Sequence, residues 1–177
     1  MTSEEYAEAA RILAKLNPGF LPFDIFQQVA RLSTLSIVEI VPLRTNSRGN
    51  VEVLLLEREA DDPIFAGQLH TPGCVVLSTD TPGSFESAFR RLIHGELGGI
   101  HTSEPSYVTQ LLHHSGRGME SSHIYWVDVK EEAAVGEFYD INHLPERFMK
   151  SQRDFLFQAV ASYGAAMRYR VATDAAK

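Results

Sequence analysis

The chain has 177 residues, a hydrophobic content of 44% and a formal net charge of −7. This size and composition predict one globular domain, and the acidic balance argues against a general nucleic-acid or membrane-surface binder, whose contact face would be basic. The single cysteine excludes an internal disulfide framework. The sequence shows neither a signal peptide nor a run of about 18 apolar residues. We therefore expect a cytoplasmic protein with no membrane or nucleic-acid partner.

The amino-terminal part predicts two helices. Residues 3–16 have Ser3 at the capping position and acidic residues in the first turn. Residues 20–32 predict the second helix, which Pro22 opens. We predict that residues 1–34 are a helical extension packed on the domain. Their aromatic residues are expected to contact the core or a partner subunit rather than take part in chemistry.

Strand patterns begin at residue 35. Residues 35–43 and 51–56 are rich in branched apolar side chains, and the polar turn at residues 46–50 joins them, which predicts a β-hairpin. Arg58 follows the second strand, where an arginine is either solvated or placed to bind an anionic ligand bidentately. Residues 75–77 predict another short strand.

A helix is predicted over residues 84–97, with Thr81 or Ser84 as its cap and the following Gly-Gly pair as its end. Its apolar residues recur at the three-and-four spacing of a buried face.

Glu96 falls on that same apolar face, in the last turn of the helix, where the helix dipole disfavours an anion. Burial and dipole both oppose a carboxylate here, so a metal cation or an arginine would be the usual compensation. The alternative is that Glu96 bends out to solvent or meets Arg91 or His94.

The carboxy-terminal half predicts strands over residues 107–114, 123–129 and 138–141, followed by a helix that begins at Pro145. Residues 166–177 are predicted to form a flexible tail. Because strands and helices mix without regular alternation, the sequence favours one mixed-sheet α/β or α+β domain.

Histidines cluster on the first of these strands. Adjacent positions on a strand face opposite sides, so only one of His113 and His114 can point into a given pocket. Both are candidates because their strand should lie beside the helix that carries Glu96. His123 is interpreted as a structural or exposed histidine. The sequence lacks the ligand sets of structural zinc, the nucleophile motif of serine hydrolases and the glycine patterns of dinucleotide or phosphate loops.

The order of these features resembles the Nudix hydrolase family over roughly residues 35–163. The segments that carry the resemblance are a strand with Arg58 at its exit, then His70-Thr71-Pro72-Gly73-Cys74, a helix ending in Glu96-Leu97-Gly98, and Phe138-Tyr139-Asp140-Ile141-Asn142-His143-Leu144-Pro145 before the last helix. The resemblance implies an α/β/α sandwich with a mixed central sheet. It assigns residues 35–165 to a Nudix-like hydrolase domain and leaves the two amino-terminal helices as an addition.

The helix matches only part of the family's R-E-U-x-E-E-x-G-U core, in which U is aliphatic. The matches are Arg91, Ile93, Glu96 and Gly98, and the departures are Leu92, Gly95 and Gly99. Two of the carboxylates with which the family binds metal are therefore missing.

This incomplete box is most similar to the GDP-mannose mannosyl hydrolase branch, which also has Leu after the box arginine and keeps only the last glutamate. The resemblance implies that Glu96 and the carbonyl group of Gly73 bind Mg²⁺ or Mn²⁺, and that Arg58 stabilises the leaving diphosphate. His113 or His114 corresponds to a strand histidine near that leaving group. A homodimer is the family-level expectation.

The branch's general base, a loop histidine preceded by a metal-binding glutamine, has no counterpart in residues 131–137. Glu137 or Glu132 is the candidate base instead. The leading hypothesis is a metal-dependent hydrolase of a nucleoside diphosphate linked to another group, with a nucleotide sugar slightly preferred. The alternative is a catalytically weakened Nudix-fold module that binds a nucleotide or regulates.

Overall fold

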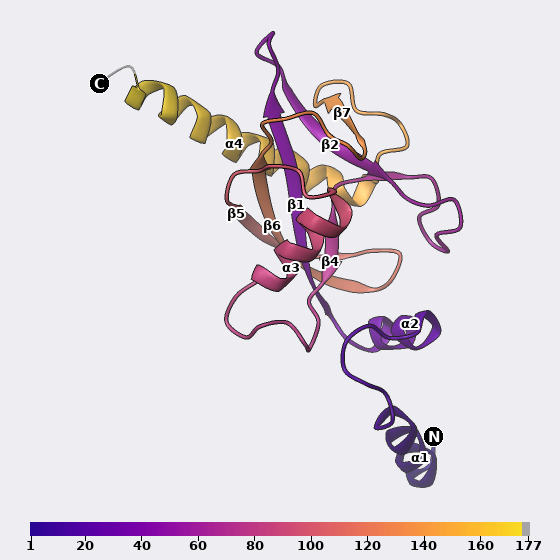
Figure 1. The fold of residues 1–177 in the computed structure, drawn as a ribbon. Helices are drawn as coiled ribbons and strands as arrows, with labels where there is room; N and C mark the ends of the chain where they lie inside the picture. The colour runs from indigo at the N-terminus through magenta and orange to yellow at the C-terminus, as the bar shows by residue number, and fades with distance from the viewer. Residues whose placement is uncertain (175–177) are drawn as a thin grey trace.

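A twisted mixed sheet organises the fold of the computed structural model, which describes residues 1–174 apart from the side chains at positions 170 and 174 (Figure 1). The strand order is β3-β2-β1-β6-β5, with β4 also paired to β1 and β7 to β2. Only the β1–β6 pair is parallel among these. The strands are β1 (Leu35–Thr45), β2 (Val51–Glu57), β3 (Leu69–His70), β4 (Gly73–Val75), β5 (Ser106–His114), β6 (Met119–Asp128) and β7 (Glu137–Asp140).

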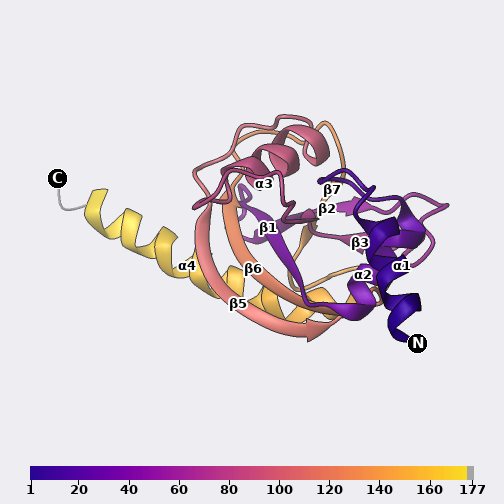
Figure 2. The same ribbon diagram turned by 90° about the horizontal axis from the view of Figure 1, so that it is seen from below.

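Helices cover both faces of the sheet, as Figure 2 shows, so the predicted mixed α+β sandwich is confirmed. One face carries α3 (Glu86–Arg90) and the π-helical turn η1 (Arg91–Glu96). The other carries the long helix α4 (Arg153–Asp174), which follows the 3₁₀ turn η2 (Lys150–Gln152).

The central strand β1 supplies both cores because its side chains alternate between the two faces. Val38 and Ile40 pack with the α3 layer, whereas Val41 and Leu43 pack with α4. All four are fully buried, and each such burial is worth about 1.5–3 kcal/mol.

Two strands share the other edge of β1. β2 pairs with its carboxy-terminal end, from Leu43 to Thr45, and β4 pairs with its amino-terminal half, from Ile37 to Glu39. The sheet therefore splits beside the middle of β1, and the turn at Pro72 and Gly73 lies at this split.

The amino-terminal helices α1 (Ser3–Leu13) and α2 (Phe23–Leu32) lie beside one end of the sheet, far from the end of α4 (Figure 1). Thr2, rather than the predicted Ser3, caps α1, because its hydroxyl accepts the amide of Glu5 while the Glu5 carboxylate accepts the amide of Thr2. α1 buries no residue and α2 buries Ala30. Contact between this extension and the domain is therefore small.

The last helix begins at Arg153 and not at Pro145, so the predicted start was wrong. The segment before it follows β3 instead: the amide of Leu69 donates to Arg147, and the amide of Met149 donates to Leu69. These bonds hold the chain extended and bury Phe148. The helix continues to Asp174, and the remaining residues of the predicted tail, 175–177, lie outside the described part.

No helix within residues 1–174 combines the length and the apolar character needed to cross a membrane.

Candidate functional site

Glu96 ends a π-helical turn where the sequence predicts an α-helix throughout. The amide of Leu97 donates to the carbonyl of Leu92 at 2.9 Å, five residues back. The wider turn shifts the side chains after it around the helix axis relative to a 3.6-residue period. Glu96 is consequently only partly buried, between the fully buried Leu92 and Leu97. Gly98 and Gly99 have φ of 67° and 77° and end the helix as predicted.

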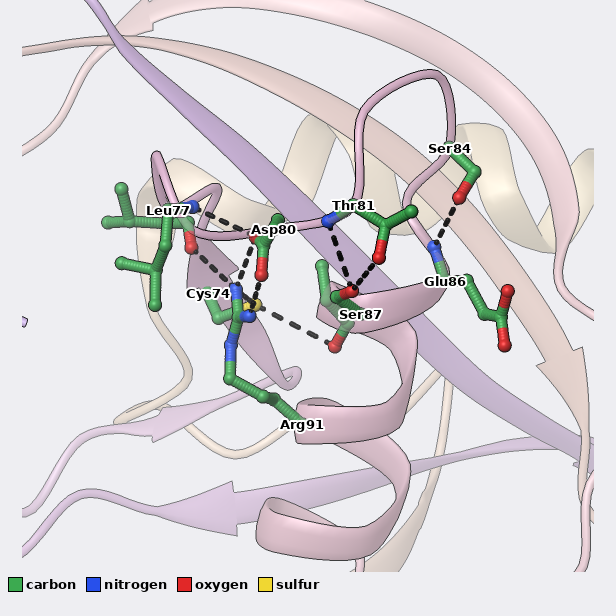
Figure 3. A network of polar contacts seen from close by, with 10 residues as sticks. Cys74, Leu77, Asp80, Thr81, Ser84, Glu86, Ser87 and Arg91 are labelled. Atoms are coloured by element: carbon green, nitrogen blue, oxygen red, sulfur yellow. Dashed lines mark hydrogen bonds and ion pairs between the residues drawn. The ribbon is translucent and has the colours of Figure 1, made fainter. Parts of the chain in front are cut away.

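The predicted caps of this helix do not act as caps. Phe85 is the residue at the cap position, and no side chain caps the helix there. Thr81 contacts the Ser87 hydroxyl at 3.1 Å instead, and Ser84 accepts a long hydrogen bond from the amide of Glu86 at 3.5 Å (Figure 3).

Arg91 braces the helix against the loop before it (Figure 3). Its guanidinium pairs with Asp80 and donates to the carbonyl of Val75 at 3.0 Å. Asp80 also accepts the amide of Leu77 at 2.9 Å, and the Arg91 guanidinium holds the pKa of Asp80 below its usual value. Arg91 is therefore committed to Asp80, which excludes it as the ion-pair partner of Glu96.

The carboxylate of Glu96 lies against the turn that the sequence predicted as its neighbour. The amide of Gly73 donates a hydrogen bond to it, and no ion pair to it forms within residues 1–174. Burial raises the pKa of Glu96 to about 7, although the charge of Arg58 and the Gly73 amide act in the opposite direction. Glu96 is thus a partly buried carboxylate whose charge is incompletely compensated.

Arg58 carries a positive charge that acts on Glu96. Its only ion pair in the described part is a long one, 4.0 Å to Asp62, and its Nε atom is buried without a hydrogen-bond partner there. His70 lies nearby, and burial, assisted by the charge of Arg58, lowers the pKa of its imidazole to about 4. The imidazole is neutral at pH 7, and its Nδ1 lies 2.8 Å from the carbonyl of Thr71. The guanidinium of Arg58 therefore has one buried N–H donor that is unused among the described residues.

Glu39 lies beside the same turn, and the sequence pattern did not single it out. It lies in the middle of β1 with 5% exposure, and burial, followed by the charge of Glu120, raises its pKa well above the usual value. Its carboxylate packs against Gly73 so closely that a Cβ atom added to this glycine would lie 2.3 Å from Oε2 and 2.6 Å from Oε1 of Glu39. The available signal was a charged residue inside the apolar run at residues 35–43.

Two cavities meet at Glu96. One, of about 580 Å³, is polar and brings Glu96 together with Glu137, Glu57 and Arg147. The Glu137 carboxylate accepts the Tyr139 hydroxyl at 2.7 Å in this cavity. Glu137 is therefore the predicted base that shares a cavity with Glu96.

The second cavity, of about 590 Å³, is largely apolar. Glu96 and Arg91 lie on one wall, and the segment around α2 supplies Phe20, Phe23 and Phe26 on another. The aromatic residues of the extension thus line a cavity next to Glu96, rather than only packing on the core.

The other predicted residues lie elsewhere. His113 is 2.9 Å from the Ser122 hydroxyl and 4.0 Å from Glu120, and exposed His114 lines a separate cavity of about 470 Å³ beside α2. Glu132 is 87% exposed and pairs with Arg44 at 3.0 Å. Neither histidine, nor Glu132, nor Arg58 lines either of the two cavities that contain Glu96.

The residues around Gly73 fit a hard divalent cation with few protein ligands. Within residues 1–174, no three His, Cys, Asp or Glu side chains are grouped so that they could hold a metal. Mg²⁺ commonly binds through one or two carboxylates and completes its shell with water and substrate phosphate oxygens. This requirement is met by two carboxylates, those of Glu96 and Glu39, together with the backbone of Gly73.

Neither a protein-family model nor a curated protein matches the sequence. Solved structures do match the fold. A mutT/nudix family protein from Listeria innocua has a TM-score of 0.62 at 15% identity, covering 76% of this chain and 97% of that one. The NUDIX domain of NrtR from Shewanella oneidensis, solved with ADP ribose, has a TM-score of 0.57 at 17% identity, covering 92% and 99%.

A MutT NUDIX hydrolase from Burkholderia pseudomallei has a TM-score of 0.54 at 20% identity, covering 71% of this chain and 98% of that one. The chain therefore has the Nudix fold.

Proposed function

We propose that this protein is a divalent-metal-dependent hydrolase that cleaves a nucleoside diphosphate from the group linked to it, with a nucleotide sugar slightly preferred. The observation that supports this most is that Glu96 lies between an apolar cavity and a polar one. Aromatic side chains suit a nucleobase and polar side chains suit a sugar. A substrate that spans both cavities would place its diphosphate at Glu96.

Glu96 and the carbonyl of Gly73 would hold Mg²⁺ or Mn²⁺, which supplies neutralising charge to the diphosphate. Arg58 would stabilise the charge that develops on the leaving nucleoside diphosphate, because its guanidinium has an unpartnered buried Nε atom. Glu137 would take the proton of the attacking water, since it shares the polar cavity with Glu96.

Turnover of a panel of nucleotide sugars and dinucleotides, with and without Mg²⁺ or Mn²⁺, tests the proposal. Wild type should give metal-supported turnover, which Glu96→Gln and Glu137→Gln should lose. Glu132→Gln is the matched control, because this glutamate pairs with Arg44 outside both cavities. Background rates for both wild type and Glu96→Gln would reject the enzyme assignment, whereas equal rates above background would reject only the role of Glu96.

The position of attack can be resolved in ¹⁸O-labelled water. We expect the label in the released sugar, which means attack at the anomeric carbon. Label in the phosphate product would be consistent with the hydrolase assignment but would show that water attacks phosphorus and not carbon.

The alternative is a catalytically weakened Nudix-fold module that binds a nucleotide. The incomplete box and the lack of a three-residue metal cluster in the described part favour it. The structural neighbour NrtR was solved with ADP ribose, so this ligand is a suitable probe. A thermal shift with ADP ribose that is independent of Mg²⁺, without product, would support the module.

A further inference from the structure

We propose that Glu39 is a second carboxylate of the Glu96 site, where it binds the same divalent cation. It would replace a carboxylate that is missing from the box helix, the helix formed by α3 and η1 that carries the incomplete family motif. This inference rests on the metal dependence of the proposed function. Its basis is the way in which two side chains from different elements converge on one glycine.

The pairing of β1 with β4 directs the backbone of Gly73 away from β1. The amide of Ile40 donates to Pro72 and the amide of Val76 donates to Ser36, both at 2.9 Å. Antiparallel strands alternate bonded and non-bonded pairs, so Glu39 and Gly73 face each other as a non-bonded pair. The N–H and C=O of Gly73 consequently point to the outer edge of β4, where Glu96 accepts the N–H.

Glu39 reaches the same glycine from the other face of the sheet. Odd positions of β1 face α4, and Gln152, just before α4, donates to Glu39 Oε2 at 3.4 Å. The carboxylate atoms of Glu39 all lie within 2.6 Å of the position that a Cβ on residue 73 would occupy. Only glycine leaves this space, so the carboxylate lies directly on the strand whose outer edge faces Glu96.

The Glu39 carboxylate lacks an ion-pair partner among the described residues, although the charges of Arg117 and Arg58 favour its ionised form. Its hydrogen-bond donor Gln152 is a neutral amide that also binds the backbone of Thr71. The Thr71 hydroxyl is likewise buried without a hydrogen-bond partner among the described residues. A buried carboxylate without a cation is costly. A divalent ion at the outer edge of Gly73 would be shared by both carboxylates.

Mn²⁺ titration followed by electron paramagnetic resonance measures the binding without any substrate. Glu39→Gln keeps the shape of the side chain and should weaken Mn²⁺ binding by at least about 10–100-fold, the range found even for groups that only support metal ligands. Glu96→Gln should weaken it similarly. Glu52→Gln, on β2 and paired with Arg44 at 2.7 Å, is the control and should bind as wild type does.

The outcomes separate this inference from the proposed function. If Glu39→Gln binds Mn²⁺ as wild type does while Glu96→Gln does not, Glu39 is structural and only this inference is wrong. If folded wild type binds no Mn²⁺, the metal dependence itself is wrong, and Glu39 has no cation to share.

Gly73→Ala provides a second test because it keeps the carbonyl but places a methyl group where the Glu39 carboxylate lies. In wild type it should weaken Mn²⁺ binding by displacing Glu39. In a Glu39→Ala background the same change should have little further effect, since nothing remains to be displaced. Equal losses in both backgrounds, with circular dichroism showing folded proteins, would contradict a role for Glu39.

Discussion

Two sets of carboxylates in this protein, all buried or partly buried, differ in how their charge is balanced. Asp80 is bound by Arg91, and Glu120, with 2% exposure, is bound by Arg117 at 2.8 Å. Glu39 and Glu96 form no ion pair within residues 1–174 and converge on Gly73. The first set joins a loop to the helix and a loop to the sheet, whereas the second leaves negative charge for a ligand to balance.

The difference has opposite consequences for stability and activity. Removing one partner of a buried pair leaves the other charge stranded and destabilises the fold. Neutralising an uncompensated carboxylate removes an unfavourable charge, so stability is kept while metal binding is lost.

Glu96→Gln should give the largest effect. We expect kcat/KM in saturating Mg²⁺ to fall by at least about 100-fold, because metal stabilisation of charge is worth several kcal/mol. The free energy of unfolding without metal should stay the same or rise. Urea denaturation beside steady-state kinetics measures both quantities, and a variant that loses stability together with activity would contradict the contrast.

Asp80→Asn should lower stability and leave metal binding unchanged. It strands the Arg91 guanidinium, and because that side chain is partly exposed we expect a loss of about 2–3 kcal/mol, less than for a fully buried pair. The Mn²⁺ affinity of the folded protein should not change. Urea denaturation measures the stability loss, and metal titration measures the Mn²⁺ affinity. A stability loss below about 0.5 kcal/mol would match an ordinary surface change and would show that the Asp80–Arg91 pair does not stabilise the fold.

His70 extends the comparison to pH. Its native pKa of about 4 lies below the ordinary 6.5, so between these values the unfolded chain binds more protons and stability falls as pH falls. From about pH 7.5 to about pH 5.5, wild type should lose about 1.4 kcal/mol more than His70→Gln. The raised pKa values of Glu39 and Glu96 act oppositely but are present in both proteins. Parallel stability curves would contradict a buried neutral histidine.

Phe20→Ser should have the smallest effect on stability, below about 0.5 kcal/mol, because the side chain is 83% exposed. If the apolar cavity binds a nucleobase, KM should rise without a change in kcat. Leu32→Ser is a matched control, since Leu32 is 73% exposed on α2 but lies outside this cavity. Equal KM values for the two variants would contradict binding of a nucleobase in this cavity.

Local patterns were sufficient to predict the β1–β2 hairpin, the box helix with its glycine end, and the mixed sheet. Periodicity could not reveal the π turn, because it assumes a constant 3.6 residues per turn. The start of the last helix was predicted wrongly since Pro145 is a common first helical residue, whereas pairing of the following segment with Leu69 is a tertiary contact.

The site was predictable where it follows the family pattern and not where it departs from it. Glu96 and Gly73 come together as their motif indicates, although 23 residues separate them. Glu39 has no motif, and its relevance depends on strand register, which fixes it opposite a glycine. From sequence, Phe20 and Phe23 are expected to contact the core or a partner subunit, and only the cavity beside Glu96 gives them a candidate role in binding.

The chain's one thiol lies in the same short strand as Gly73 and can report on how that strand opens. Burial raises the pKa of Cys74 to about 11, and its sulfur contacts the helix at the Ala88 carbonyl. Since the thiolate is the reactive species, alkylation should be slow while β4 is closed against the helix and approach the rate of an ordinary cysteine when it opens. Cys74 is partly exposed and lines the apolar cavity, so its labelling rate should rise when β4 moves away from the helix, and a cation that binds at Gly73 should slow it.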